Sequence, residues 1–399
     1  MRRPALALCV ALLAGAAAYG AGRLSDVGGD LPVQAQPAPL PPSPTPAAVA
    51  PVPPAVTPEP AAPPPVVEPP SVPEPASLPP RASISGIRHE YQRLNNCGPV
   101  TIGMALSRWG STLNQYDIAP RLKPARGDVN VSPDELAAYA RAQGMTVHLA
   151  RGGDRTLLRT LLAAGFPVIV ETWFVTHDAG GMGHYRLLTG YDDAAMKLSA
   201  LDSYLGPLKL DYAAFDELWR SFGRSYLVVA PPAKADEVRR LLGIRAEPAA
   251  AKAETLRVAQ AEAARRGDAV AYLNLGQARL DLGDARGAAR AFDQAFAAPA
   301  DPRLDPTRPA WVQGGLPWRT LWYSFGPLEA WVRTGRHADA LRQSAAVLRS
   351  APAHEEAHYW RGRALSGLGR VTEAQAAYRE ALRLRPGFLA AQQALDRLN

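Results

Sequence analysis

The segment QRLNNCGPVTIGMALSRWG (residues 92–110) contains Cys97 at the expected start of a helix. Pro99 stands just inside that start, apolar residues follow, and Gly110 marks the expected end. A cysteine at a helix N-terminus has its sulfur near unpaired backbone N–H groups and the positive end of the helix dipole, and both stabilise the thiolate. An unpaired cysteine is often only a small buried side chain. The position at a helix start nevertheless favours a nucleophile, provided that the chain also supplies a base.

The sequence that follows predicts an α+β domain. SPDELAAYARAQG (132–144) has the pattern of a capped helix, with a Ser132–Glu135 capping box and a terminal Gly144. Helices are also expected in DRTLLRTLLAAG (154–165) and DYAAFDELWRSFG (211–223). Strands are expected in MTVHLA (145–150), FPVIVETWF (166–174), HYRLLTGYD (184–192), MKLSALD (196–202) and SYLVVA (225–230). Helices followed by a sheet of about five strands indicate an α+β domain that ends near residue 232.

The base must be a histidine, and the expected domain contains several. His148 is placed in the middle of a strand, His177 lies in a loop without a rigid scaffold, and His89 is upstream of the cysteine. We expect His184 to open a strand directly after GGMG (180–183). The glycines would let a substrate backbone approach closely, and the strand would hold the ring rigidly. His184 is therefore the favoured base.

A catalytic imidazole needs a partner on its second nitrogen, and the next strand ends in Asp202. If the two strands are antiparallel neighbours, Asp202 can lie beside His184. Asp192 and Asp193 fall in the connecting turn at the other end. Gln92, five positions before the cysteine, could donate its side-chain amide to a developing oxyanion beside the Cys97 backbone N–H.

Three motifs together, Q-x4-CGP (92–99), GHYRLLTGYDD (183–193) and ALDSYLGP (200–207), resemble the C39-like branch of the papain-like cysteine peptidases. The resemblance covers about residues 84–232 and implies a papain-like α+β fold. It implies Cys97 as nucleophile, His184 as general base and then acid, Asp202 as orienting acid and Gln92 as oxyanion donor. Ser203 follows the aspartate where family members often have proline. The chain has no Gly-Lys dipeptide and so no Walker A loop, which argues against leader processing coupled to export.

Residues 246–399 resemble tetratricopeptide repeats, which makes this an all-α region. The turn glycines Gly283, Gly335 and Gly369 are each followed by an alanine five positions later and by Phe292, Ser344 and Tyr378, respectively, four positions further on. The last two glycines are 34 residues apart, the period of these repeats. The first two are 52 apart, so 18 extra residues around DPRLDPTRPAWVQGGLPW (301–318) interrupt the array. Such helices bind peptide segments of a protein partner, or they brace the peptidase-like domain, and the pattern leaves both open.

The N-terminal segment predicts export. Residues 1–24 have two arginines before a short apolar run with small residues, the layout of a signal peptide or membrane anchor. Residues 25–83 form a proline-rich linker, since 21 of the 39 prolines lie within residues 32–80, and we expect it to be disordered and extended. We therefore expect the folded part to lie outside the cytoplasm, in the periplasm or an equivalent compartment, with possible anchoring in the membrane.

The composition bounds the remaining function classes. The net charge is +7, but the arginines are spread along the chain and there are only five lysines, so no basic groove for nucleic acid is expected. DVNVSPD (128–134) resembles the start of a calcium loop but lacks the required glycine and final glutamate. We expect no cofactor and no metal. The leading hypothesis is a peptidase acting on a peptide or protein substrate, and the alternative is a scaffold that keeps the cleft without turnover.

Overall fold

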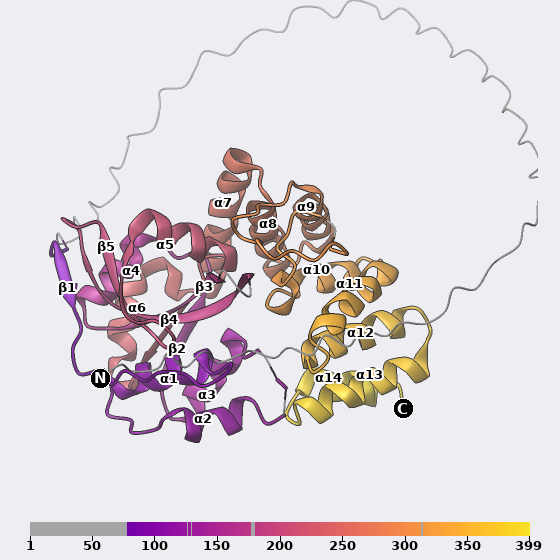
Figure 1. Cartoon of the computed structure of the whole chain (residues 1–399), viewed down its shortest axis with the longest axis horizontal. Helices are drawn as coiled ribbons and strands as arrows, with labels where there is room; N and C mark the ends of the chain where they lie inside the picture. Colours follow the sequence, from indigo (N-terminus) through magenta and orange to yellow (C-terminus); the bar gives the residue numbers. More distant parts are fainter. Residues whose placement is uncertain (1–77, 126, 129, 177–179, 313) are drawn as a thin grey trace, which may run out of the picture. The chain divides into compact units, whose positions relative to one another are not determined.

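The computed structural model describes residues 78–399 except 126, 129, 177–179 and 313 (Figure 1). The predicted signal or anchor and nearly all of the proline-rich linker lie outside the described residues, and so does His177. Within the described part of the chain, no helix is both long enough and apolar enough to cross a bilayer.

The first half of the described chain forms one antiparallel sheet in the order β2-β7-β3-β4-β5-β6, with β1 paired to β4. The strands are β1 (Arg81–Ser83), β2 (Thr146–Ala150), β3 (Val168–Thr176), β4 (Gly180–Asp192), β5 (Lys197–Asp202), β6 (Gly206–Asp211) and β7 (Tyr226–Ala230). The expectation of about five strands was therefore low by two. β1 has only three residues and lies within residues 25–83, so the prediction of a disordered linker was wrong for Arg81–Ser83, which pair with β4. β6 begins with a Gly-Pro pair that is typical of a turn.

Helices cover both faces of this sheet (Figure 1). On one face lie α1 (Cys97–Ser107), α2 (Gln115–Leu122) and α3 (Pro133–Ala142), and on the other lie α4 (Arg155–Ala163), α5 (Tyr212–Trp219) and α6 (Ala235–Leu242). Successive residues of β3 alternate between the two cores: Val168 and Val170 pack with α4 to α6, and Ile169 packs with α1 to α3. Because β3 is buried on both faces, its sequence is a nearly continuous apolar run and does not alternate with polar residues.

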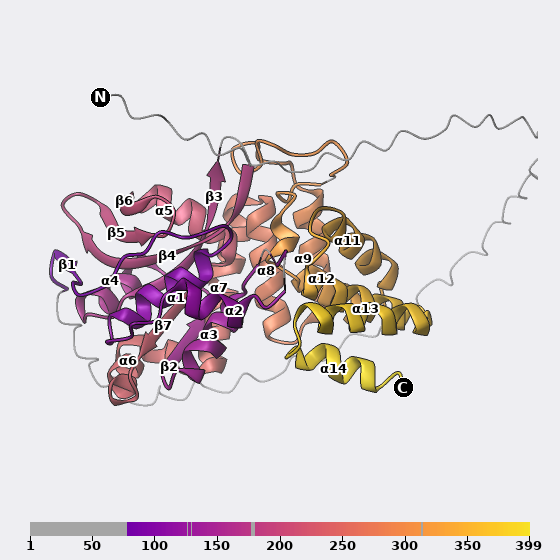
Figure 2. The same cartoon turned by 60° about the horizontal axis from the view of Figure 1, so that its bottom comes forward.

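The second half is helical (Figure 2). It contains α7 (Pro248–Arg266), α8 (Ala269–Asp281), α9 (Ala285–Ala297), α10 (Gly326–Arg333), α11 (His337–Ser350), α12 (Glu355–Gly367), α13 (Val371–Leu384) and α14 (Leu389–Asp396). The repeat pattern is confirmed in detail. Gly283, Gly335 and Gly369 adopt the positive φ of the turns within α8–α9, α10–α11 and α12–α13. The residues four after the repeat alanines, Phe292 and Tyr378 among them, are fully buried.

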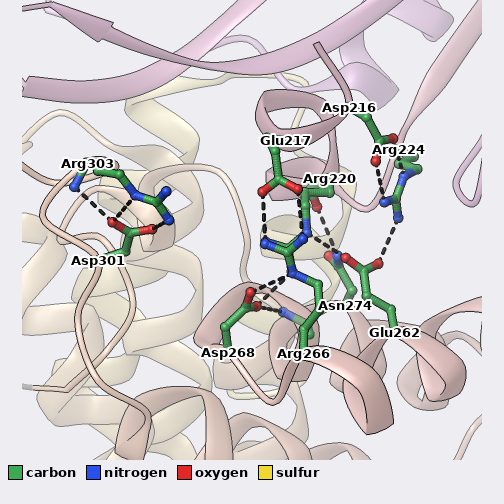
Figure 3. Close-up of polar contacts among 11 residues, drawn as sticks. Asp216, Glu217, Arg220, Arg224, Glu262, Arg266, Asp268, Asn274, Asp301 and Arg303 are labelled. Atoms are coloured by element: carbon green, nitrogen blue, oxygen red, sulfur yellow. Dashed lines mark hydrogen bonds and ion pairs between the residues drawn. The ribbon is translucent and has the colours of Figure 1, made fainter. Parts of the chain in front are cut away.

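A buried ionic network joins the helical half to the α+β half (Figure 3). Arg220, directly after α5, contacts Glu262 of α7 at 2.5 Å and Asp268 at 2.7 Å. Arg224 bridges Glu262 and Asp216 at 2.7 Å each. Removing one partner from such a network leaves a buried charge unpaired, at a cost of about 3–5 kcal/mol. The network therefore holds α7 against the end of α5.

Candidate active site

Cys97 is the first residue of α1, as the sequence predicted, and it is partly exposed. Asn96 makes no side-chain cap, so the helix N-terminus directs its unpaired N–H groups toward the thiol region. The backbone N–H groups of Gly98 and Tyr185 donate to the sulfur. Gly98 also has to be small, because a Cβ there would lie 3.3 Å from Val131. The sequence and the packing thus place a thiol at a helix start beside β4.

His184 projects from β4 toward this sulfur and forms a hydrogen bond with it. The prediction that His184 opens a strand was wrong. β4 begins at Gly180, and Gly181 and Gly183 pair with β3, so the glycines belong to the strand instead of a loop. The tight packing explains them: a Cβ on Gly183 would lie 2.9 Å from the Tyr323 ring. The ring of His184 is 4% exposed and lies 4.9 Å from the Phe174 ring, between centroids.

Asp202 ends β5 and lies beside His184, because β4 and β5 are antiparallel neighbours with Arg186 opposite Asp202. His184 Nε2 lies 3.0 Å from Asp202 Oδ1. The same oxygen accepts the backbone N–H groups of Tyr204 at 2.8 Å and Leu205 at 2.9 Å. Arg186 Nε donates to Oδ2 at 2.8 Å, and its Nη1 donates to Thr172. Because these donors fix the carboxylate, the imidazole has one defined orientation.

The electrostatics of the three groups favour a charged pair. Burial alone would raise the pKa of the Cys97 thiol, but its hydrogen bond to His184 and the charge of that ring lower it overall. Burial alone would lower the pKa of His184, but its hydrogen bonds to Asp202 and Cys97 raise it to about 9. Burial opposes ionisation of Asp202 too, and its donors still hold its pKa well below the usual value. These shifts favour a thiolate beside an imidazolium and a carboxylate over the neutral thiol and imidazole.

Gln92 contacts Ser203, the residue that follows Asp202. Its backbone N–H donates to the Ser203 carbonyl at 2.8 Å, and its side-chain Oε1 accepts the Ser203 hydroxyl at 2.7 Å. An amide whose oxygen is held in this way keeps its N–H groups for another acceptor. Ser203, the departure from the family motif, therefore orients the residue that was predicted to be the oxyanion donor.

The other histidines have different surroundings. His148 lies in the middle of β2, as predicted, where it contacts the Tyr226 hydroxyl at 3.3 Å and its burial lowers its pKa. The ring of His89 lies 2.9 Å, through Nε2, from the backbone oxygen of Asp202, so it supports the strand end. Neither replaces His184 beside the thiol.

Sequence reasoning missed several residues around the site. Arg186 was recognisable, because it lies two positions after His184 and therefore on the same strand face. Glu171, a charged residue within the apolar run of β3, is 5% exposed. Burial, together with the Cys97 charge, raises its pKa well above the usual value. It lines a cavity of about 60 Å³ with Tyr323, whose pKa is raised by burial and by the charges of Cys97 and Glu171.

Tyr323 belongs to the connection between α9 and α10 (residues 298–325), which includes the residues that interrupt the repeats, and this segment packs on β3 and β4. Trp173 Nε1 donates to the Leu304 carbonyl at 2.7 Å, and Arg319 Nη1 donates to the Gly181 carbonyl at 3.0 Å. The Tyr323 ring contacts Trp173 edge to face at 6.3 Å between centroids. No pattern in the sequence indicated this contact, because it depends on how the two halves pack together.

Comparison with known proteins agrees with the resemblance noted in the sequence. Residues 84–227 match the family described as the Peptidase_C39 like family, and residues 355–388 match the tetratricopeptide repeat. None of the curated proteins matches the chain.

Several solved structures show partial similarity. The peptidase domain of Streptococcus ComA is 16% identical over 37% of this chain and 99% of its own, with a TM-score of 0.31. A putative C39-like peptidase from Bacillus anthracis is 17% identical over 38% of this chain and 97% of its own, with a TM-score of 0.31. MamA from Desulfovibrio magneticus RS-1 is 22% identical over 41% of this chain and 82% of its own, with a TM-score of 0.30. With TM-scores this low, the family matches remain the informative finding.

Proposed function

We propose that this chain, which carries a C39-like domain followed by a tetratricopeptide repeat, is a cysteine peptidase with Cys97, His184 and Asp202 as its triad. The observation that supports it most is the unbroken line of hydrogen bonds from the thiol through a buried imidazole to a carboxylate held by three other donors. A buried histidine with a purely structural role would need neither the thiol nor the helix N-terminus beside it.

The proposed reaction follows from these positions. The Cys97 thiolate attacks the peptide carbonyl carbon, and the oxyanion receives hydrogen bonds from the Cys97 N–H and the Gln92 side chain. The His184 imidazolium then gives its proton to the leaving amine, and the C–N bond breaks to leave a thioester on Cys97. A water molecule, deprotonated by His184, attacks the thioester and releases the acid. Asp202 keeps the ring oriented and stabilises its charge throughout.

Alkylation by iodoacetamide tests the site without a known substrate. In a Cys9→Ser background, Cys97 is the one thiol of the chain. We expect it to react at pH 6 much faster than free cysteine, since each unit by which the pKa is lowered gives about ten times more thiolate there. His184→Ala should remove the advantage, whereas His148→Ala, a matched change on β2, should leave it. Equal rates for Cys97 and free cysteine at pH 6 would refute the proposal.

A non-catalytic scaffold predicts a different outcome in a second assay. Digestion of a mixed peptide library, followed by mass spectrometry, should yield cleavage products and a transient acyl adduct on Cys97 if the chain is a peptidase. A scaffold would bind peptides equally well in wild type and Cys97→Ala and would release none cleaved. A reactive Cys97 together with no cleavage of any peptide would favour the scaffold.

We also propose that the peptidase acts outside the cytoplasm and that its helical region engages a protein partner. Support for export comes from the layout of residues 1–24, and support for partner binding comes from the tetratricopeptide repeat. Fusion of residues 1–83 to alkaline phosphatase, which is active only after export, tests the first point. An inactive fusion would contradict it.

A further inference from the structure

A second cluster of ionisable side chains lies between α12 and the C39-like domain, well outside the catalytic residues. His354, Glu355 and Glu356 stand at the start of α12. Asp128 and Glu135, from the segment before α3 and from α3 itself, complete the group. All five are at most 8% exposed. Gly127 lies against Ala353, with 3.5 Å between a Cβ at Gly127 and the Ala353 Cβ, which brings the two segments together.

The three residues of α12 point toward one another. One nitrogen or oxygen atom from each of His354, Glu355 and Glu356 lies within 4.8 Å of the others. His354 Nε2 lies 2.7 Å from the Trp322 carbonyl oxygen, which can only accept, so this nitrogen carries the proton. In a neutral ring Nδ1 then presents its lone pair to Glu356 Oε2, 3.2 Å away. A lone pair facing a carboxylate oxygen is repulsive unless a proton or a metal cation lies between them.

The hydrogen-bond inventory of the cluster points to a missing ligand. Among the described residues, nothing donates a hydrogen bond to Glu355 Oε1, although Glu355 is 2% exposed. His354 Nδ1 and Glu356 Oε2 face each other at 3.2 Å and have no other partner with hydrogen-bond geometry. Buried polar atoms are nearly always paired. An unpaired buried carboxylate oxygen beside a nitrogen and an oxygen that face each other is the arrangement that a bound cation would satisfy.

The negative charge of the cluster is also only partly balanced. The Arg385 guanidinium lies 3.2 Å from oxygens of both Glu135 and Glu356, and the positive charge of Lys123 interacts with Asp128. Four carboxylates thus face two cations and one imidazole. The carboxylates therefore outnumber the cationic side chains that contact or face this cluster in the described part of the chain.

We propose that His354 Nδ1 and the carboxylates of Glu355 and Glu356 bind a divalent transition-metal cation, next to Asp128 of the C39-like domain. One imidazole nitrogen with carboxylate oxygens suits Zn²⁺ or Mn²⁺ better than Mg²⁺ or Ca²⁺, which prefer oxygen alone. The contact between His354 Nε2 and a backbone carbonyl is the second contact that metal-bound histidines usually make. The site thus lies where the third repeat meets the segment before α3.

Zinc binding tests the proposal on the full chain. The parent is Cys9→Ser/Cys97→Ala, because the catalytic thiol and His184 would otherwise bind Zn²⁺ themselves. After treatment with EDTA and removal of the chelator, titration calorimetry with ZnCl₂ should show one ion per chain. Glu355→Gln should weaken this binding at least about tenfold, because even the loss of a group that only orients a ligand costs about 10–100-fold in metal affinity. The apo variant should still fold, since glutamine keeps the size of the side chain and Glu355 Oε1 accepts no hydrogen bond that the change would remove.

The matched control is Glu373→Gln, the same change at an exposed position of α13 where Glu373 pairs with Arg370. Its zinc affinity should equal that of the parent. His354→Gln, which can still donate to the Trp322 carbonyl, should weaken binding as Glu355→Gln does. Thermal unfolding should shift upward with Zn²⁺ in the parent and the control only. Absence of stoichiometric binding, or equal affinity in the Glu355 and Glu373 variants, would overturn the proposal, and the cluster would then hold protons alone.

Discussion

Asp202→Asn is the change that most directly tests how the proposed triad works. The carboxylate of Asp202 is fully buried, and its hydrogen bond is the largest favourable contribution to the raised pKa of His184. A pKa of about 9 against a usual 6.5 means that the folded site favours the imidazolium by about 3 kcal/mol. Asparagine has nearly the shape of aspartate and keeps a side-chain oxygen as a hydrogen-bond acceptor, but it removes the negative charge.

The rate of Cys97 alkylation, measured from pH 5 to 10, reports the pKa of His184 in the folded site. In the wild-type triad the rate should change in two steps, one when the thiolate forms and one near pH 9 when His184 loses its proton. In Asp202→Asn the second step should move down by roughly one to two pH units, because an opposite charge beside the ring is lost. A second step that stays near pH 9 in Asp202→Asn would refute the reasoning.

The same substitution leaves Arg186 buried without its carboxylate, so a loss of folding has to be separated from a loss of function. Breaking such a pair costs about 3–5 kcal/mol. Arg186→Met removes the guanidinium and keeps the contact between His184 and Asp202. It should therefore lower the thermal midpoint while the alkaline step stays near pH 9.

A His184 pKa above its unfolded value also stabilises the fold below about pH 6.5, and this contribution disappears as the pH rises through about 9.

Three further outcomes are expected. Gln92→Ala should lower kcat on a peptide substrate by roughly 10²–10³ with little change in KM, and an unchanged kcat would remove Gln92 from the oxyanion site. Phe292→Ala, at a fully buried repeat position, should lower the free energy of unfolding in urea by about 3–5 kcal/mol, whereas a loss under about 1 kcal/mol would contradict the packing. Gly181→Ala would place a Cβ against the Leu304 carbonyl and the Trp173 indole and should lower the thermal midpoint, while Gly387→Ala, with open space around it, should not. Equal midpoints for the two glycine variants would contradict the close contact.

Local patterns in the sequence predicted the elements whose causes are local. The capping box of Ser132 and Glu135 forms as expected, and Pro133 opens the helix. Antiparallel pairing of β4 and β5 was enough to place His184 beside Asp202, because the end of β5 pairs with Arg186, two residues after His184 on β4. The repeat glycines adopt positive φ because a tight turn between two helices needs it.

The errors and omissions arose where tertiary packing decides the conformation. The glycines before His184 favoured a loop by composition, yet they are strand residues that let Tyr323 and Leu304 approach β4 closely. The cluster of ionisable residues at the start of α12 could not be predicted for the same reason, since Asp128 and His354 are far apart in the sequence. No periodicity within either segment predicts that they meet.

The sequence left open whether the helical region braces the peptidase-like domain or recruits a partner, and the contacts favour bracing for part of it. The segment that interrupts the repeats donates from Arg319 to Gly181, three residues before His184 on the same strand. Arg220 and Glu262 hold the first helices of the region against α5. If bracing is the main role, Gly181→Ala should slow the alkylation of Cys97 as well as lower the thermal midpoint, because a displaced β4 misplaces the imidazole. If recruitment dominates, alkylation should stay fast and only the cleavage of a protein substrate should suffer. The Gly181→Ala variant thus distinguishes a role of the helical region in positioning His184 from a role in binding a protein substrate.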